Sequence, residues 1–217
     1  MATPIRIVPQ GEIAAGTSDP PPLLLPKLES LFSDRARRFG VLASSGHSDA
    51  KYLAFMQQLA LAQQAAMEQH AMPPALSASH MELCHRHALP PLAKDTTREP
   101  QWRDALRQIV TAITHVAPAP AQASLRALQS ASDEALDAMA DRLLAFDYPA
   151  LDAAMVPFLG AALQVHWSRR AIAAGLEAFK KLDMPGICPV CGAPPVASVL
   201  HIDTPVPGSR YLACALC

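Results

Sequence analysis

Four of the five cysteines of this 217-residue chain form two Cys-x-x-Cys pairs close to its end. Cys188 and Cys191 make the first pair, Cys214 and Cys217 make the second, and 22 residues (192–213) separate them. Zinc ribbons and rubredoxin-like sites bind one tetrahedral metal ion through four thiolates at this kind of spacing. The pattern therefore predicts a four-thiolate metal site. Two unrelated pairs, either redox-active or merely reduced, are the alternative.

The residues around the first pair favour a metal-binding turn. Pro189 fixes φ near the value that the first corner of a tight turn requires, and Gly192 can adopt the positive φ that directs backbone N–H groups at the sulfurs. Thiolates bind both iron and zinc, so the sequence leaves the metal open between these two. If Cys217 does not ligate, His201 is the alternative fourth ligand.

A small β-hairpin is expected between the two cysteine pairs. Val196, Val199 and Leu200 are strand-prone, and a Pro-Val-Pro-Gly turn at 205–208 precedes a second strand-prone segment at 210–212. One cysteine pair would then lie at each end of the hairpin.

The rest of the chain has helical patterns. Residues 1–22 are polar and proline-rich, which predicts an extended arm, and residues 23–184 predict an all-helical body in two halves joined near 117–120. Ser132 is a candidate N-cap. The fold class is mainly α, with a C-terminal rubredoxin-like or zinc-ribbon module at 185–217. The expected helices cover 23–43, 48–70, 75–88, 100–116, 121–130, 133–146 and 151–181.

Charge and hydropathy exclude several classes of protein. With 18 Lys and Arg against 19 Asp and Glu, the net charge of −1 gives no general attraction to nucleic acid or anionic membranes. The start of the chain lacks the pattern of a signal peptide, and no apolar run is long enough to span a membrane. We therefore expect a cytoplasmic protein, whose reducing surroundings suit thiolate ligation. Its apolar helix surface is sufficient for a homodimer.

Smaller groups of residues outside the ribbon have two interpretations each. His80, Cys84 and His87 share one helical face and could bind a metal, although a His-rich helix with a half-buried free thiol is the simpler interpretation. Arg35 could contact an acidic partner surface, although arginines on an amphipathic helix commonly form its solvated face. Two tryptophans at apolar helical positions are expected in the core: Trp102 and Trp167.

Several segments match one protein family in the same order along the chain. They are 5–10 (IRIVPQ), 21–26 (PPLLLP) followed by Arg35-Ala36, 52–55 (YLAF), Trp102, 188–196 (CPVCGAPPV) and 210–217 (RYLACALC). Together they resemble the formate dehydrogenase accessory protein family, FdhE. The resemblance covers essentially the whole chain, and the segment CPVCG makes it specific.

The resemblance implies a cytoplasmic factor that binds the catalytic subunit of respiratory formate dehydrogenases before their twin-arginine export. Such a factor is not itself an enzyme, and the sequence has no phosphate loop, nucleophile elbow or paired-carboxylate site. The family expectation for the metal is iron, with zinc as the alternative. Competing functions are a rubredoxin-like iron protein for redox or oxygen sensing and a zinc-ribbon interaction adaptor.

Family members have two metal modules with further Cys-x-x-Cys pairs, whereas this chain ends on Cys217. A knuckle is the turn that carries one Cys-x-x-Cys pair. It also uses backbone N–H donors from the residues after its second cysteine, and none follow Cys217. We therefore expect a chain that is truncated within its first module, where the site is strained or lacks its metal.

Overall fold

The computed structural model describes residues 20–217 except 70, 95–97, 183, 185 and 201–207. This part of the chain is mainly helical with a small two-stranded sheet near its C-terminus, so the predicted fold class is confirmed. The predicted arm at 1–22 lies almost wholly outside the described residues. The elements are α1 Leu31–Ser44, α2 Ala50–Gln69, α3 Ala78–Arg86, α4 Gln101–Ile113, α5 Ala119–Ser130, α6 Asp133–Leu144, α7 Val156–Ala174, β1 Pro195–Leu200 and β2 Arg210–Cys214, with 3-10 turns η1 Tyr148–Ala150 and η2 Leu176–Ala178.

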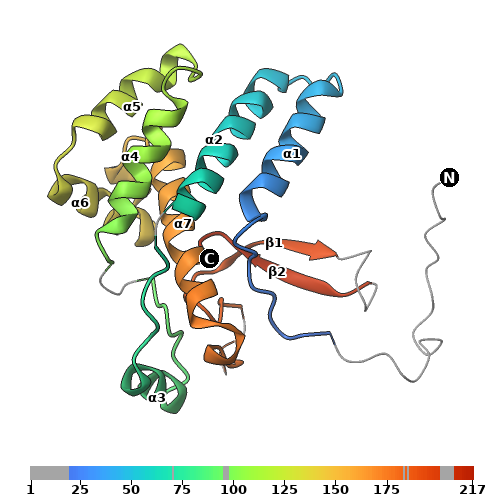
Figure 1. The fold of residues 1–217 in the computed structure, drawn as a ribbon, viewed down its shortest axis with the longest axis vertical. Coiled ribbons are helices and arrows are strands. Elements are labelled where there is room, and N and C mark those ends of the chain that lie inside the picture. The colour runs from blue at the N-terminus through green and yellow to red at the C-terminus, as the bar shows by residue number, and fades with distance from the viewer. Residues whose placement is uncertain (1–19, 70, 95–97, 183, 185, 201–207) are drawn as a thin grey trace.

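The helices pack around α7. Helices α1 and α2 form a pair on one side, and α4, α5 and α6 lie on the other (Figure 1). Helices α2 and α4 contact each other directly, and α7 packs against α2, α4 and α6. The buried residues of α7 lie around its whole circumference rather than along one stripe, and they include the polar residues His166, Ser168 and Arg169. None of the helices in the described part of the chain combines the length and hydrophobicity that a membrane crossing requires.

Helix α1 begins at Leu31, later than the predicted start at 23. Pro26 has no backbone N–H and disfavours helical conformation in the residue before it, so the helix forms only after this proline. The first N–H groups of α1 then need acceptors. Gln64 of α2 supplies one, because its Oε1 accepts from the backbone N–H of Phe32 at 3.0 Å and of Ser33 at 3.1 Å. A residue of α2 therefore caps the N-terminus of α1.

Helix α7 is shorter than the predicted 151–181 and ends at Ala174. Pro157 lies in its first turn, where a missing N–H breaks no helical hydrogen bond, as the sequence required. Gly175 has a φ of 75° and donates its N–H to the carbonyls of Ala171 and Ile172, both at 3.2 Å. This glycine stops the helix before the predicted end at 181.

Helices α4 and α6 are joined by an ion-pair network that surrounds a fully buried tryptophan. Asp137 of α6 accepts a hydrogen bond from Trp102 Nε1 at 3.0 Å and from Arg103 Nη1 at 2.6 Å. Trp102 is 0% exposed, which confirms its predicted place in the core. Ser132 caps α6 as predicted, accepting from the N–H of Ala135 at 3.3 Å.

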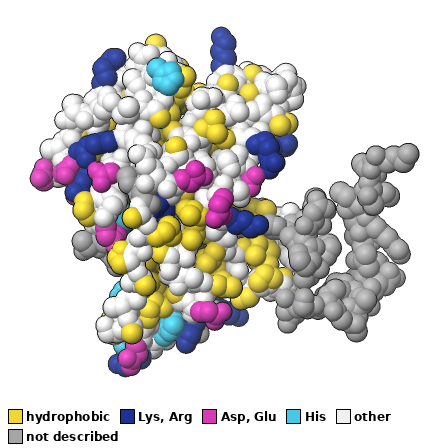
Figure 2. All heavy atoms as spheres, viewed as in Figure 1, with side chains coloured by type: hydrophobic (Ala, Val, Ile, Leu, Met, Phe, Trp, Pro, Cys, Tyr) yellow, Lys and Arg dark blue, Asp and Glu magenta, His cyan; other side chains and the backbone are white. Residues whose placement is uncertain are grey.

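Strands β1 and β2 form the expected antiparallel hairpin. Pro195 pairs with Cys214 and Leu200 pairs with Arg210, and an irregularity between Pro195 and Ala197 shifts the register by one residue. Most of this sheet is exposed, whereas the cysteine-containing ends lie against the helices. Figure 2, drawn in the same view as Figure 1, shows hydrophobic side chains gathered in the lower middle of this face of the molecule.

Asp137→Ala is expected to lower the free energy of unfolding by about 2 kcal/mol, because it removes the acceptor of a buried indole N–H and of a guanidinium. Urea titration followed by circular dichroism measures this. Asp147→Ala is the control, since Asp147 is exposed and its side chain makes no capping bond. A change within about 0.5 kcal/mol is expected for it. Equal effects of the two substitutions would contradict the assigned role of Asp137.

His166 of α7 is buried in the neutral form. Burial is the main reason that its pKa falls from 6.5 to about 3, and the positive charges of Arg170, Arg98 and Arg169 lower it further. Glu99 Oε2 lies 3.4 Å from His166 Nε2 and opposes this effect, but that carboxylate is already paired with Arg170 at 3.0 Å. His166 therefore binds a proton more readily in the unfolded chain than in the folded one.

Acidification should consequently destabilise the body through His166. Between pH 6.5 and pH 4 the unfolded state takes up a proton that the folded state does not, which lowers the free energy of unfolding by about 3 kcal/mol. In His166→Gln this contribution disappears, so the stability difference between variant and wild type should change with pH over this range. Urea titrations at pH 7, 5.5 and 4.5 measure it, and a pH-independent difference would contradict the assignment.

Candidate metal centre

The first cysteine pair lies in a tight turn closed by backbone hydrogen bonds. The N–H of Gly192 donates to the carbonyl of Cys188, and the N–H of Cys188 donates to the carbonyl of Ala193, both at 2.9 Å. Gly192 has a φ of 73°, the positive value anticipated from the sequence. Pro90 Cγ would lie 3.3 Å from a Cβ at this position, so a larger residue would be both strained and crowded.

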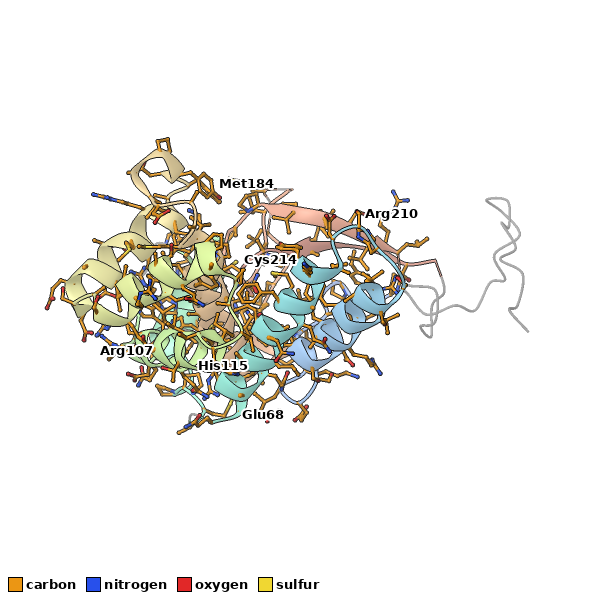
Figure 3. The ribbon with its side chains drawn as sticks, turned by 90° about the horizontal axis from the view of Figure 1, so that it is seen from above. Glu68, Arg107, His115, Met184, Arg210 and Cys214 are labelled. Carbon is orange, nitrogen blue, oxygen red and sulfur yellow. The ribbon has the colours of Figure 1, made fainter. Side chains whose placement is uncertain are left out.

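The second pair begins at the last residue of β2. Cys214 accepts a hydrogen bond at its Sγ from the N–H of Leu216, at 3.3 Å. The side chain of Leu216 is buried in the same core cluster as residues of α4 and α7. Figure 3 shows Cys214 at the base of the hairpin beside the helices, with Arg210 towards its other end.

The sulfur atoms of the four cysteines form one cluster. The Sγ atoms of Cys188, Cys191, Cys214 and Cys217 lie within 4.8 Å of one another, and all four residues are free thiols. Two of the separations are 3.4 Å, between Cys188 and Cys217, and 3.5 Å, between Cys191 and Cys214. Metal–sulfur bonds of about 2.3 Å place tetrahedral ligands about 3.8 Å apart. The donor set and its spacing therefore fit one zinc or iron ion, whereas the sequence alone predicted a site that is strained or lacks its metal.

The proton affinities of the four thiols depend on one another. Hydrogen bonds from Cys188, Cys191 and Cys217 lower the pKa of Cys214 well below its usual range. Hydrogen bonds with Cys188, Cys191 and Cys214 raise the pKa of Cys217, and burial of this thiol raises it further. The first negative charge is thus favoured on Cys214, and a bound cation is what allows the remaining thiols to ionise beside it.

Backbone pairing attaches the first knuckle to the helical body. The N–H of Leu92 donates to the carbonyl of Val190 at 2.9 Å, and the N–H of Lys94 donates to the carbonyl of Cys191 at 3.0 Å. The indole N–H of Trp167 in turn donates to the carbonyl of Leu92 at 2.9 Å. Trp167 is buried as predicted, but its role in holding this segment has no sequence signature.

The other candidate ligands do not join the centre. His80 Nε2 lies 2.8 Å from the carbonyl oxygen of Pro91 and 3.5 Å from Cys84 Sγ, and His87 does not complete a ligand set with them. Among the described residues, the four cysteines form the one group of three or more side chains close enough to share a metal ion. His201, the alternative fourth ligand, lies outside the described residues. Cys217 is one of the four clustered cysteines.

Arg35 has partners within the chain. Its guanidinium lies 5.1 Å from the ring centroid of Phe32 and donates to Gln164 Oε1 at 3.1 Å. Arg35 is an exposed residue of α1, and its contact with a partner stays a prediction.

Comparison with known proteins places this chain. The model of the N-terminal region of FdhE matches residues 20–181, and the model of the FdhE central domain matches residues 187–217. The chain belongs to the FdhE family. An FdhE homolog of Stutzerimonas stutzeri (strain A1501) is 34% identical over 212 residues, 97% of this chain and 69% of that protein. The FdhE of Salmonella paratyphi A is 33% identical over 98% of this chain and 70% of its own length.

A solved FdhE structure has the same fold. The crystal structure of FdhE from Pseudomonas aeruginosa matches with a TM-score of 0.72 and 34% sequence identity, over 91% of this chain and 67% of that one. The family resemblance noted in the sequence is thereby confirmed.

The metal centre is testable by elemental analysis of the anaerobically purified protein. We expect about one iron or zinc ion per wild-type chain and almost none in the Cys188→Ser, Cys191→Ser double variant, because two hydroxyls replace two of four thiolates. Cys84→Ser is the matched control, since this buried thiol lies outside the cluster, and it should retain the metal. Full occupancy in the double variant would contradict the four-thiolate site.

Proposed function

We propose that this protein is an accessory factor for respiratory formate dehydrogenase, which it binds through the catalytic subunit in the cytoplasm. Membership of the FdhE family, over nearly the whole chain, supports this role. The protein acts by binding its client, and its metal serves that binding; it is not itself an enzyme. The maturation of an active dehydrogenase depends on it.

The observation that carries this proposal is the shared core of ribbon and body. Val190, Cys191, Ala193 and Leu216 are buried together with residues of the central helices, so the knuckles are part of the helical core rather than a separate appendage. A metal that orders the knuckles therefore also shapes the neighbouring surface of the body.

The chemistry of the centre is compatible with a structural metal or a redox metal. Zinc would supply folding energy alone, whereas iron with the same ligands would add a one-electron couple. We propose iron as the physiological metal, in line with the resemblance, and a structural role in client binding as its first effect. Zinc-loaded protein should then bind the client as well as iron-loaded protein does.

Co-purification with the formate dehydrogenase catalytic subunit tests the proposal. Metal-loaded wild type should retain the subunit, and the Cys188→Ser, Cys191→Ser double variant should retain at least about tenfold less, because the loss of its metal loosens the ribbon-side surface. Cys84→Ser should bind like the wild type. Arg35→Ala, tested alongside, examines the predicted partner contact. Absence of binding by metal-loaded wild type would overturn the proposed function.

A further inference from the structure

We propose that Gln164 is a positioning residue of the metal centre, which fixes the second knuckle to the helical body and is itself oriented by Arg35 and Gln63. The inference rests on the metal centre of the proposed function and assigns a role to three polar residues outside the cysteine motif. It starts from one hydrogen bond: Gln164 Nε2 of α7 donates to the carbonyl of Ala215 at 2.7 Å.

Ala215 is well placed to transmit this contact. It lies between Cys214 and Cys217, so its peptide group is part of the turn that sets the separation of these two sulfurs. The side chain of Ala215 is small and exposed and does not anchor the turn by packing. The hydrogen bond from Gln164 therefore restrains the backbone of the knuckle itself.

The carboxamide of Gln164 has one favoured orientation. Its Oε1 accepts from Arg35 Nη1 and from Gln63 Nε2, both at 3.1 Å. Both partners are donors only at these atoms, so the oxygen must face them and the NH2 group must face Ala215. Flipping the amide would set donors against donors and leave the carbonyl of Ala215 facing another oxygen.

The two orienting residues are themselves held. Gln63 is 3% exposed and also donates to the carbonyl of Ala161 at 3.0 Å. Arg35 lies over the ring of the fully buried Phe32. Residues of α1 and α2 thus act through Gln164 of α7 on the second knuckle, while the segment around Leu92 holds the first. Outer contacts of this kind commonly change metal affinity about 10- to 100-fold.

The test uses Co(II) as the probe, because its thiolate charge-transfer and d–d absorption reports the geometry of the four sulfurs. Gln164→Met keeps the length of the side chain and removes both polar ends. We expect it to release Co(II) to a chelator about 10- to 100-fold faster than the wild type, with an altered d–d spectrum. Gln164→Glu should behave similarly, because a carboxylate still accepts from Arg35 but cannot donate to Ala215.

Two further variants separate positioning from general stability. Gln129→Met is the matched control, since Gln129 is an exposed helical glutamine whose amide donates to Thr111 in a different part of the body; it should release Co(II) at the wild-type rate. Arg35→Met should accelerate release and Arg35→Lys should largely restore the wild-type rate, because lysine supplies a donor to Gln164.

Wild-type release and spectrum in Gln164→Met would overturn the inference while leaving the metal centre intact. If Gln164→Met loses its helical circular dichroism, Arg35→Met decides instead, and a wild-type rate there is the overturning result. Failure of the unmodified chain to take up Co(II) would overturn the metal centre of the proposed function and this inference with it. If the unmodified chain retains Co(II) normally but does not bind the formate dehydrogenase catalytic subunit, that result would count against the proposed function alone.

Discussion

The structure depends on one constraint: the ribbon has too few apolar side chains to fold by itself. Most of the hairpin is exposed, and its buried residues cluster at the knuckles, where Val190 and Leu216 join the core of the helical body. A two-stranded hairpin of this size is at best marginally stable in water. Metal ligation and packing against the body must therefore stabilise it together, which explains why the cysteines lie against helices instead of projecting into solvent.

Helix α7 satisfies this constraint because it has no solvent face along most of its length. Its apolar side chains pack against α2, α4 and α6, and three of its other side chains, Gln164, Trp167 and Arg169, donate hydrogen bonds to neighbouring segments. Arg169 donates to the carbonyl of Met67 in the last turn of α2 and to that of Ala71 beyond the end of this helix. Trp167 donates to the carbonyl of Leu92, in the segment that pairs with the first knuckle. One buried helix thus sets the position of α2 and of the ribbon at once.

Local patterns predicted the cysteine cluster, the hairpin and most helices, because each depends on neighbours in sequence. The predicted start of α1 and the predicted end of α7 were wrong. The apolar spacing typical of a helix continues across Pro26 and Gly175, but the backbone preferences of these two residues decide the boundaries. The cap from Gln64 and the pairing of Leu92 with Val190 could not be predicted. Both join segments far apart in the chain through groups that every glutamine and every backbone possesses, so no motif marks them.

The attachment of both knuckles to earlier parts of the chain has a consequence for biosynthesis. Leu92, Gln164 and Trp167 all precede Cys188, so the surface that receives the ribbon leaves the ribosome before any of the four clustered thiols does. Because chains fold from the N-terminal side during synthesis, the helices can assemble first and serve as a template for the cysteines. Unligated thiols are then open to oxidation only until the cysteine segments dock on helices that have already folded. The length of this interval does not depend on the folding time of the whole chain.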